Sequence, residues 1–161
     1  MLSEIISSAI WGQRKQPELV DFGYTTERAD RESIRYGHDT IDGEVILSQS
    51  RDKPTFQSSR TAPALVGVMF GFWVNLPRKL FAQSFHAKVY HPAMGLEGRT
   101  HQQWPLRYQN FAGQMFVGYR LEDEFELVLG DWSFELWNRD RRLMEQTLQL
   151  VAPAMHNQTE R

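Results

Sequence analysis

The sequence contains no cysteine. It therefore has no disulfide bond, no thiolate ligand for a metal ion and no cysteine nucleophile. No apolar run approaches the roughly 20 residues that a membrane-spanning helix requires, so we expect no membrane segment. The first residues, "MLSEIISSAIWGQRK", lack a basic leader in front of a long apolar core, which makes the cytoplasm the expected location.

Several sequence motifs that are typical of catalysis or nucleotide binding are also missing. The chain has no GxSxG elbow, no Walker or Rossmann glycine pattern, and no HxH or HExxH spacing. Its net charge of -2 provides no overall attraction to nucleic acid or to an anionic membrane. We therefore expect no cofactor, no nucleic-acid partner and no membrane partner.

The composition that remains is typical of one soluble globular domain. The 161 residues are 41% hydrophobic and 24% charged, and a chain of this length buries roughly 70% of its unfolded surface. We predict one domain over residues 1–152, in which the polar stretch 13–42 is a variable loop or insert. Residues 153–161 are predicted to form a flexible tail.

Short segments with alternating apolar and polar residues, separated by glycine and proline, predict strands. The segment 25–37 favours either a short helix or a surface loop, and Pro105 predicts an edge strand because proline cannot donate to a sheet. About seven or eight strands with at most one short helix predict an all-β fold, a single-domain antiparallel β-sandwich; a closed barrel is the alternative. The predicted strands are residues 3–12, 43–50, 63–77, 85–91, 100–109, 113–121, 131–137 and 143–151.

The last two predicted strands form a hairpin with one buried face. Trp132, Phe134 and Leu136 alternate with polar residues and are predicted to lie in the core. Their partners across the hairpin are predicted to be Leu148, Gln146 and Met144, or a set shifted by two residues. No Asn-Gly or Asp-Gly pair is present, so we expect a loop of three or five residues. Leu143 then faces the wrong side unless a bulge turns it.

Four segments resemble a bacterial family that is catalogued only as a domain of unknown function. They are "SSAIWG", "ALVGVMFGFWVNL", "YHPAMG" and "FELVLGDWSFELWNRDRRLMEQTLQLV". The resemblance spans most of the chain, although residues 13–42 match poorly. It implies an immunoglobulin-like sandwich, and the family offers no catalytic residues to carry over.

Histidines and acidic residues provide candidates for chemistry. His91 and His101 flank a turn that contains Glu97, and two imidazoles with a carboxylate suit zinc that keeps an open position. His86 and His91 lie five residues apart on one predicted strand and so face opposite ways. In the acidic run "LEDEFEL", residues 121–127, alternation predicts a strand with a solvated glutamate face, and paired carboxylates for acid–base catalysis are the alternative.

Outward-facing aromatic residues provide the remaining candidates. By strand parity, Trp137 points away from Trp132, and Tyr90 shares its face with His86. Exposed aromatic side chains stack sugars or anchor protein partners. We predict a partner or ligand surface formed by Trp137, Tyr90, His86 and Leu143.

The sequence thus favours a non-enzymatic interaction module that binds a protein partner, or a second copy of itself through an edge strand. The first alternative is a sandwich that binds a carbohydrate or another small ligand through Trp137 and Tyr90. The second is a metal-dependent hydrolase built around His91 and His101.

Overall fold

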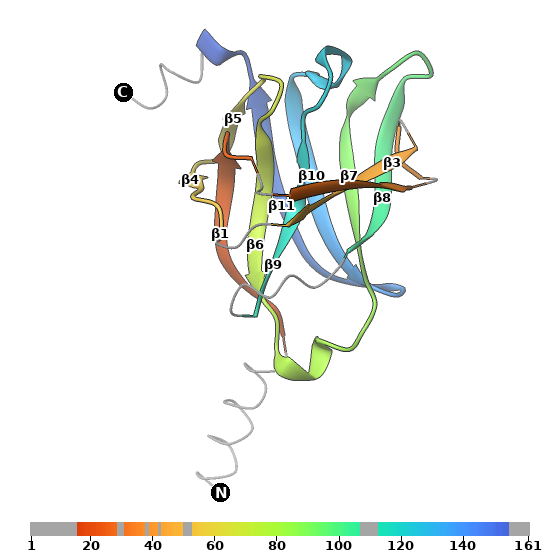
Figure 1. Ribbon diagram of the computed structural model, residues 1–161. Helices are drawn as coiled ribbons and strands as arrows, with labels where there is room; N and C mark the ends of the chain where they lie inside the picture. The colour runs from red at the N-terminus through yellow and green to blue at the C-terminus, as the bar shows by residue number, and fades with distance from the viewer. Residues whose placement is uncertain are drawn as a thin grey trace, which may run out of the picture.

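The computed structural model describes residues 16–28, 31–37, 39–41, 43–49, 53–106 and 113–154. In this part of the chain, two sheets enclose one hydrophobic core, and a two-stranded hairpin crosses in front of the long strands in the view of Figure 1. None of the described helical turns is long or apolar enough to cross a membrane.

The first sheet has four strands and the second has five. The first contains, in spatial order, β4 (Gln57–Ser58), β1 (Glu18–Thr25), β6 (Met69–Asn75) and β9 (Gln114–Arg120). The second contains β5 (Thr61–Pro63), β11 (Arg141–Val151), β10 (Gly130–Asn138), β7 (Phe85–Met94) and β8 (Arg99–Leu106). The separate hairpin pairs β2 (Arg31–Tyr36) with β3 (Glu44–Gln49), and two short 3₁₀ turns are η1 (Arg78–Leu80) and η2 (Glu124–Glu126).

This arrangement confirms the predicted β-sandwich and excludes the closed barrel, because the four- and five-stranded sheets are separate. Among the described strands, pairing is antiparallel except between β5 and β11, which run parallel. The strands predicted from residue 43 onward are present with shifted ends, and β8, which contains Pro105, lies at a sheet edge as predicted. The strand predicted at residues 3–12 and the tail from residue 155 lie outside the described residues.

The prediction of a polar loop over residues 13–42 was wrong. Residues 18–25 form β1, which lies between β4 and β6, and residues 31–36 form β2 where a short helix or loop was expected. β2 pairs with β3 residue by residue, from Arg31 opposite Gln49 to Tyr36 opposite Glu44. Hydrogen bonding to a partner strand thus decides the structure of this charged segment, and its own weak apolar periodicity does not reveal that partner.

Aromatic side chains from both sheets fill the core. Phe70 of β6 meets Trp132 and Phe134 of β10 edge-on, with ring centroids 5.1 and 5.2 Å apart. Trp132 and Phe134 are buried, as predicted. Gly71 lies between Gly23 and Gly118 on the adjacent strands, and a Cβ at Gly71 would approach the Val117 carbonyl oxygen to 2.2 Å. The absence of a side chain at Gly71 therefore allows the backbone of the neighbouring strand to pack closely.

The closing hairpin has the first of the two predicted registers, with Trp132 opposite Leu148 and Leu136 opposite Met144. The predicted loop of three or five residues was wrong, because Asn138 pairs with Arg141 and only two residues form the turn. Arg139 takes a left-handed conformation, with φ of 52°, which two-residue hairpin turns require of their first residue.

The antiparallel order brings three connections to one end of the sandwich. They are residues 64–68 between β5 and β6, residues 95–98 between β7 and β8, and residues 121–129 between β9 and β10. These connections lie at the upper end in Figure 1, and we call them the loop end. The turn between β10 and β11 lies at the opposite end.

Candidate functional site

Most of the side chains predicted to form a binding surface lie on the outer face of the five-stranded sheet. β7 and β10 are paired there, with Tyr90 opposite Ser133 and His86 opposite Trp137. Trp137 is only half-exposed, because the Lys88 Nζ lies 3.9 Å from its ring centroid and the His86 ring lies beside it at 6.0 Å. Its indole N–H donates to Glu135 Oε1 at 3.1 Å. The indole is thus already engaged by side chains of its own sheet.

Charged residues on this face are also paired with one another. Glu135 lies directly opposite Glu145, and Arg142 Nη1 bridges their carboxylates at 2.9 and 3.0 Å. The hydrogen bond that Arg142 donates to Glu135, together with the negative charge of Glu145, raises the pKa of Arg142. Desolvation and the neighbouring Lys88 lower the pKa of His86. The first shift favours a positive Arg142 on β11, and the second favours a neutral His86 on β7.

Tyr90 is more exposed than Leu143, which is half-buried. Tyr90 is 43% exposed, and its ring lies 6.1 Å from that of exposed His101 at an interplanar angle of 30°. Leu143 is the extra residue of a bulge in β11 and packs against the core. Leu143 is therefore half-buried against the core, and its place on a binding surface stays a prediction.

The structure does not bring the three candidate metal ligands together. His101 shares the outer face with Tyr90, whereas His91 is buried with its ring 4.8 Å from that of Trp132. Glu97 is exposed in the turn between β7 and β8. Among the described residues, no group of three His, Asp or Glu side chains is placed to hold a metal ion.

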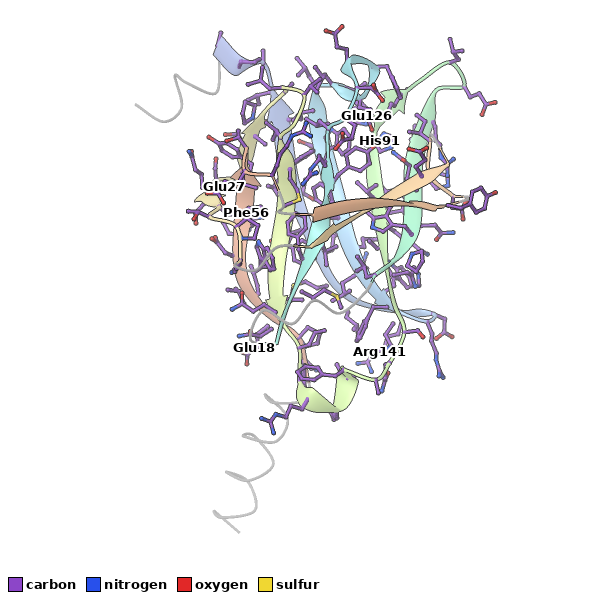
Figure 2. The ribbon with its side chains drawn as sticks, in the orientation of Figure 1. Glu18, Glu27, Phe56, His91, Glu126 and Arg141 are labelled. Carbon is purple, nitrogen blue, oxygen red and sulfur yellow. The ribbon has the colours of Figure 1, made fainter. Side chains whose placement is uncertain are left out.

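Beneath the loop end, a buried chain of hydrogen bonds links β7, β8, β9 and η2. His91 Nδ1 lies 2.8 Å from the Pro92 carbonyl oxygen, so Nδ1 carries the proton and Nε2 accepts from Gln102 Nε2 at 3.0 Å. The Gln102 amide also donates to the Tyr119 hydroxyl at 3.4 Å, and that hydroxyl donates to Glu126 Oε2. Figure 2 shows Glu126 and His91 close to each other near this end.

This network requires a neutral His91. Burial lowers the pKa of His91, the hydrogen bond with Pro92 opposes the shift, and the positive charges of Arg99 and His101 add to it. A proton on Nε2 would face the N–H group of Gln102, which is a donor facing a donor. The network can hold its polar side chains in place. The imidazole ring of His91 is enclosed by the core.

The network also fixes the loop between β9 and β10. Glu126 is buried, and its Oε1 accepts the backbone N–H groups of Glu122 and Asp123 at 2.8 Å each. The strand with a solvated glutamate face predicted over residues 121–127 was wrong, because η2 interrupts the alternation and turns Glu126 into the interior. A buried carboxylate here satisfies loop N–H groups that a strand would have paired with a neighbouring strand.

Sequence reasoning missed the exposed apolar side chains of the loop end. Leu65 and Val66 lie between β5 and β6, Leu96 lies at the tip of the β7–β8 turn, and Phe125 and Leu129 lie between β9 and β10. The first two and the last two are 46–53% exposed, and Leu96 is fully exposed. The available signal was a leucine inside the turn sequence "GLEG", where polar residues are usual.

Comparisons with known proteins agree with the architecture. Residues 28–150 match the model of a family described as a domain of unknown function (DUF3859). The crystal structure of an immunoglobulin-like protein from Pseudomonas aeruginosa superposes with a TM-score of 0.54 at 15% identity, over 86% of this chain and 98% of that chain. At this identity the likeness shows the fold alone. The comparison with curated proteins found no match. The predicted resemblance to an immunoglobulin-like family of unknown function is thus confirmed.

Proposed function

This chain belongs to the family described as a domain of unknown function (DUF3859), and we propose that its sandwich is a module that binds a protein partner at the loop end. One observation carries this proposal. Five large apolar side chains, Leu65, Val66, Leu96, Phe125 and Leu129, are exposed on three loops at the same end of the sandwich. Apolar side chains gathered on a surface are typical of sites where another molecule docks.

The three loops are held by hydrogen bonds, which supports docking without a large loss of loop entropy. The loop that contains Leu65 and Val66 is tied to the start of the β9–β10 loop, because Gly67 N donates to Leu121 O at 2.7 Å. The turn around Leu96 is closed by a bond of 3.3 Å from Gly98 N to Gly95 O. The buried Glu126 fixes the loop that carries Phe125.

The outward edge of β8 is less suited to pairing with a second copy. The Gln103 N–H already donates to Asp39 O at 3.1 Å, and Pro105 has no N–H to offer. The His101 carbonyl oxygen accepts from Arg99 Nε at 2.7 Å. The segment around Asp39 therefore protects this edge, as loops often do in β proteins. This supports docking through the loops over docking through this edge strand.

Selection of binders from a random peptide display library tests the proposal. We expect the wild-type domain to select peptides whose binding is lost in the double variant Leu96→Ser, Phe125→Ser. The matched control is Tyr90→Ser on the outer sheet face, which should retain binding. Both positions of the double variant are exposed, so its melting temperature should stay close to that of the wild type. Selected peptides that bind the double variant and the wild type equally would contradict the proposal.

A second candidate function rests on the exposed ring pair of Tyr90 and His101. Adjacent aromatic rings on a sheet face are used to stack sugar rings, so this pair favours a carbohydrate ligand. Trp137 contributes less than the sequence suggested, because Lys88 lies over its ring. A glycan array with wild type and Tyr90→Ala tests this function. Binding that the variant abolishes supports it, and an array without any bound glycan opposes it.

A further inference from the structure

We infer that the partner docks at the loop end through a cationic segment that also presents apolar side chains. This inference rests on the proposed function and adds the chemistry of the partner to it. The observation behind it is the charge of the same three loops that expose the apolar residues.

All ionisable side chains in the three loops are acidic. Residues 64–68, "ALVGV", contain none; residues 95–98, "GLEG", contain Glu97; and residues 121–129, "LEDEFELVL", contain the other four, of which Glu126 is buried. Glu97, Asp123 and Glu124 are exposed, and Glu122 is half-exposed. Exposed apolar side chains are therefore flanked by carboxylates, without a single lysine or arginine in these loops.

The nearest arginines in the sequence, Arg99 and Arg120, already serve other groups. Arg99 donates to the backbone oxygens of His101, Thr40 and Asp39, at 2.7, 3.2 and 2.6 Å. Arg120 is buried, and its Nε lies 3.7 Å from Glu122 Oε1. Arg99 Nη2 also lies 3.5 Å from Asp39 Oδ1, so each of these arginines is paired with an acidic side chain other than Glu97 and Glu124, whose negative charge can act on a partner.

This charge pattern favours a basic partner over the other occupants. A second copy docked by the same end in a two-fold contact would set acidic loops against acidic loops, which is unfavourable. An anionic membrane or a nucleic acid would meet the same repulsion. A segment that alternates lysine or arginine with leucine or phenylalanine would match both the carboxylates and the apolar side chains.

Three synthetic peptides of equal length test this inference by fluorescence anisotropy. One combines lysine with leucine, the second lysine with serine, and the third glutamate with leucine. We expect the lysine–leucine peptide to bind at least about tenfold more tightly than either of the others, which is about 1.4 kcal/mol. Its binding should weaken as the salt concentration rises from about 0.1 M to about 1 M, because the screening length falls from about 10 Å to about 3 Å.

Charge reversal locates the interaction. Glu97→Lys and Glu124→Lys should each weaken binding of the lysine–leucine peptide by about threefold or more, the usual scale of one charge contact. The matched control, Glu18→Lys, makes the same change in net charge at the other end of the sandwich and should have little effect (Figure 2). Equal losses in all three variants, or equal binding of the glutamate–leucine peptide, would overturn the inference.

The two proposals fail in different ways. If displayed peptides require Leu96 and Phe125 but contain no excess of basic residues, the loop end is a docking site and the cationic partner is wrong. If binding of every peptide is indifferent to these two apolar residues, the proposed function itself falls. The lysine–leucine peptide could also bind while Glu97→Lys and Glu124→Lys have no more effect than Glu18→Lys. The peptide would then respond to the net charge of the protein and not to the loop end, and the inference would also be wrong.

Discussion

Trp132 and Trp137 lie five residues apart on β10 and serve different purposes because they point to opposite faces. Trp132 is enclosed by Phe70, Tyr119 and His91, and its indole N–H donates to Val128 O at 3.0 Å. Trp137 lies on the outer face under Lys88. The two residues show how strand parity separates packing in the core from pairing at the surface.

Alanine substitutions measure this difference. Trp132→Ala is expected to lower the free energy of unfolding by about 3–5 kcal/mol, because it removes apolar contacts and leaves a cavity. Trp137→Ala should cost roughly 1–2 kcal/mol, the combined scale of a partly exposed cation–π contact and one hydrogen bond. Urea denaturation of both variants tests this. Equal losses would show that the outward position of Trp137 is wrong.

His91 gives the fold a predictable dependence on pH. Its pKa is lowered in the folded state, mainly by burial, from the ordinary value of 6.5. The resulting stability is fully present above pH 6.5 and is lost as the pH falls through the folded-state pKa. We expect the free energy of unfolding to fall between about pH 7 and about pH 5, and His91→Gln to flatten this slope.

The matched control is His101→Gln. His101 is an exposed histidine one strand away, and its charge is the smallest of the influences on the pKa of His91, so its replacement should change the slope much less than His91→Gln does. Urea unfolding of the three proteins across this range provides the comparison. If His91→Gln kept the full wild-type slope, His91 would not be the group that responds.

At the scale of elements, the hairpin of β10 and β11 combines a strained turn with a bulge. Arg139 occupies the left-handed region, which asparagine and glycine tolerate better than arginine. The bulge then restores the inward direction of Leu143. Two local irregularities thus allow a sequence with no Asn-Gly pair to close with two residues.

A substitution at Arg139 tests the turn. Arg139→Asn should raise the free energy of unfolding by about 0.5–1 kcal/mol, because asparagine adopts the left-handed conformation at lower cost. Arg139→Val should lower it by about 1 kcal/mol or more, since a β-branched side chain is least tolerant of positive φ. Thermal unfolding of the two variants gives the order of stability. The reverse order would contradict the two-residue turn.

At the scale of the whole molecule, the fold was largely predictable from the sequence, and the proposed docking surface at the loop end was not. Apolar and polar residues alternate in segments such as 85–91 and 131–137 with the two-residue period of a β-strand. Local sequence is therefore enough to predict the sandwich. The exposure of Leu65, Leu96 and Phe125 depends on which loops meet at one end, which is a non-local property. Trp137 and Leu143 are only half-exposed, because a lysine on the neighbouring strand lies over Trp137 and a bulge lets Leu143 pack against the core.

The family and the immunoglobulin-like neighbour support the architecture, while the loop end provides the argument for function. A sandwich holds its loops on a rigid scaffold, and similar scaffolds host unrelated functions. Specificity in such modules therefore depends on the loops. Here the loops combine aliphatic side chains, one phenylalanine and several carboxylates.

The most direct test of binding at the loop end is a map of amide chemical shifts, by nuclear magnetic resonance, as a display-selected peptide is added to the wild-type domain. We expect the largest changes to fall within residues 64–68, 95–98 and 121–129. Tyr90, His101 and the turn at Arg139 should change little. Changes centred on the outer face of β7, β8 and β10, with the three loops unaffected, would contradict binding at the loop end.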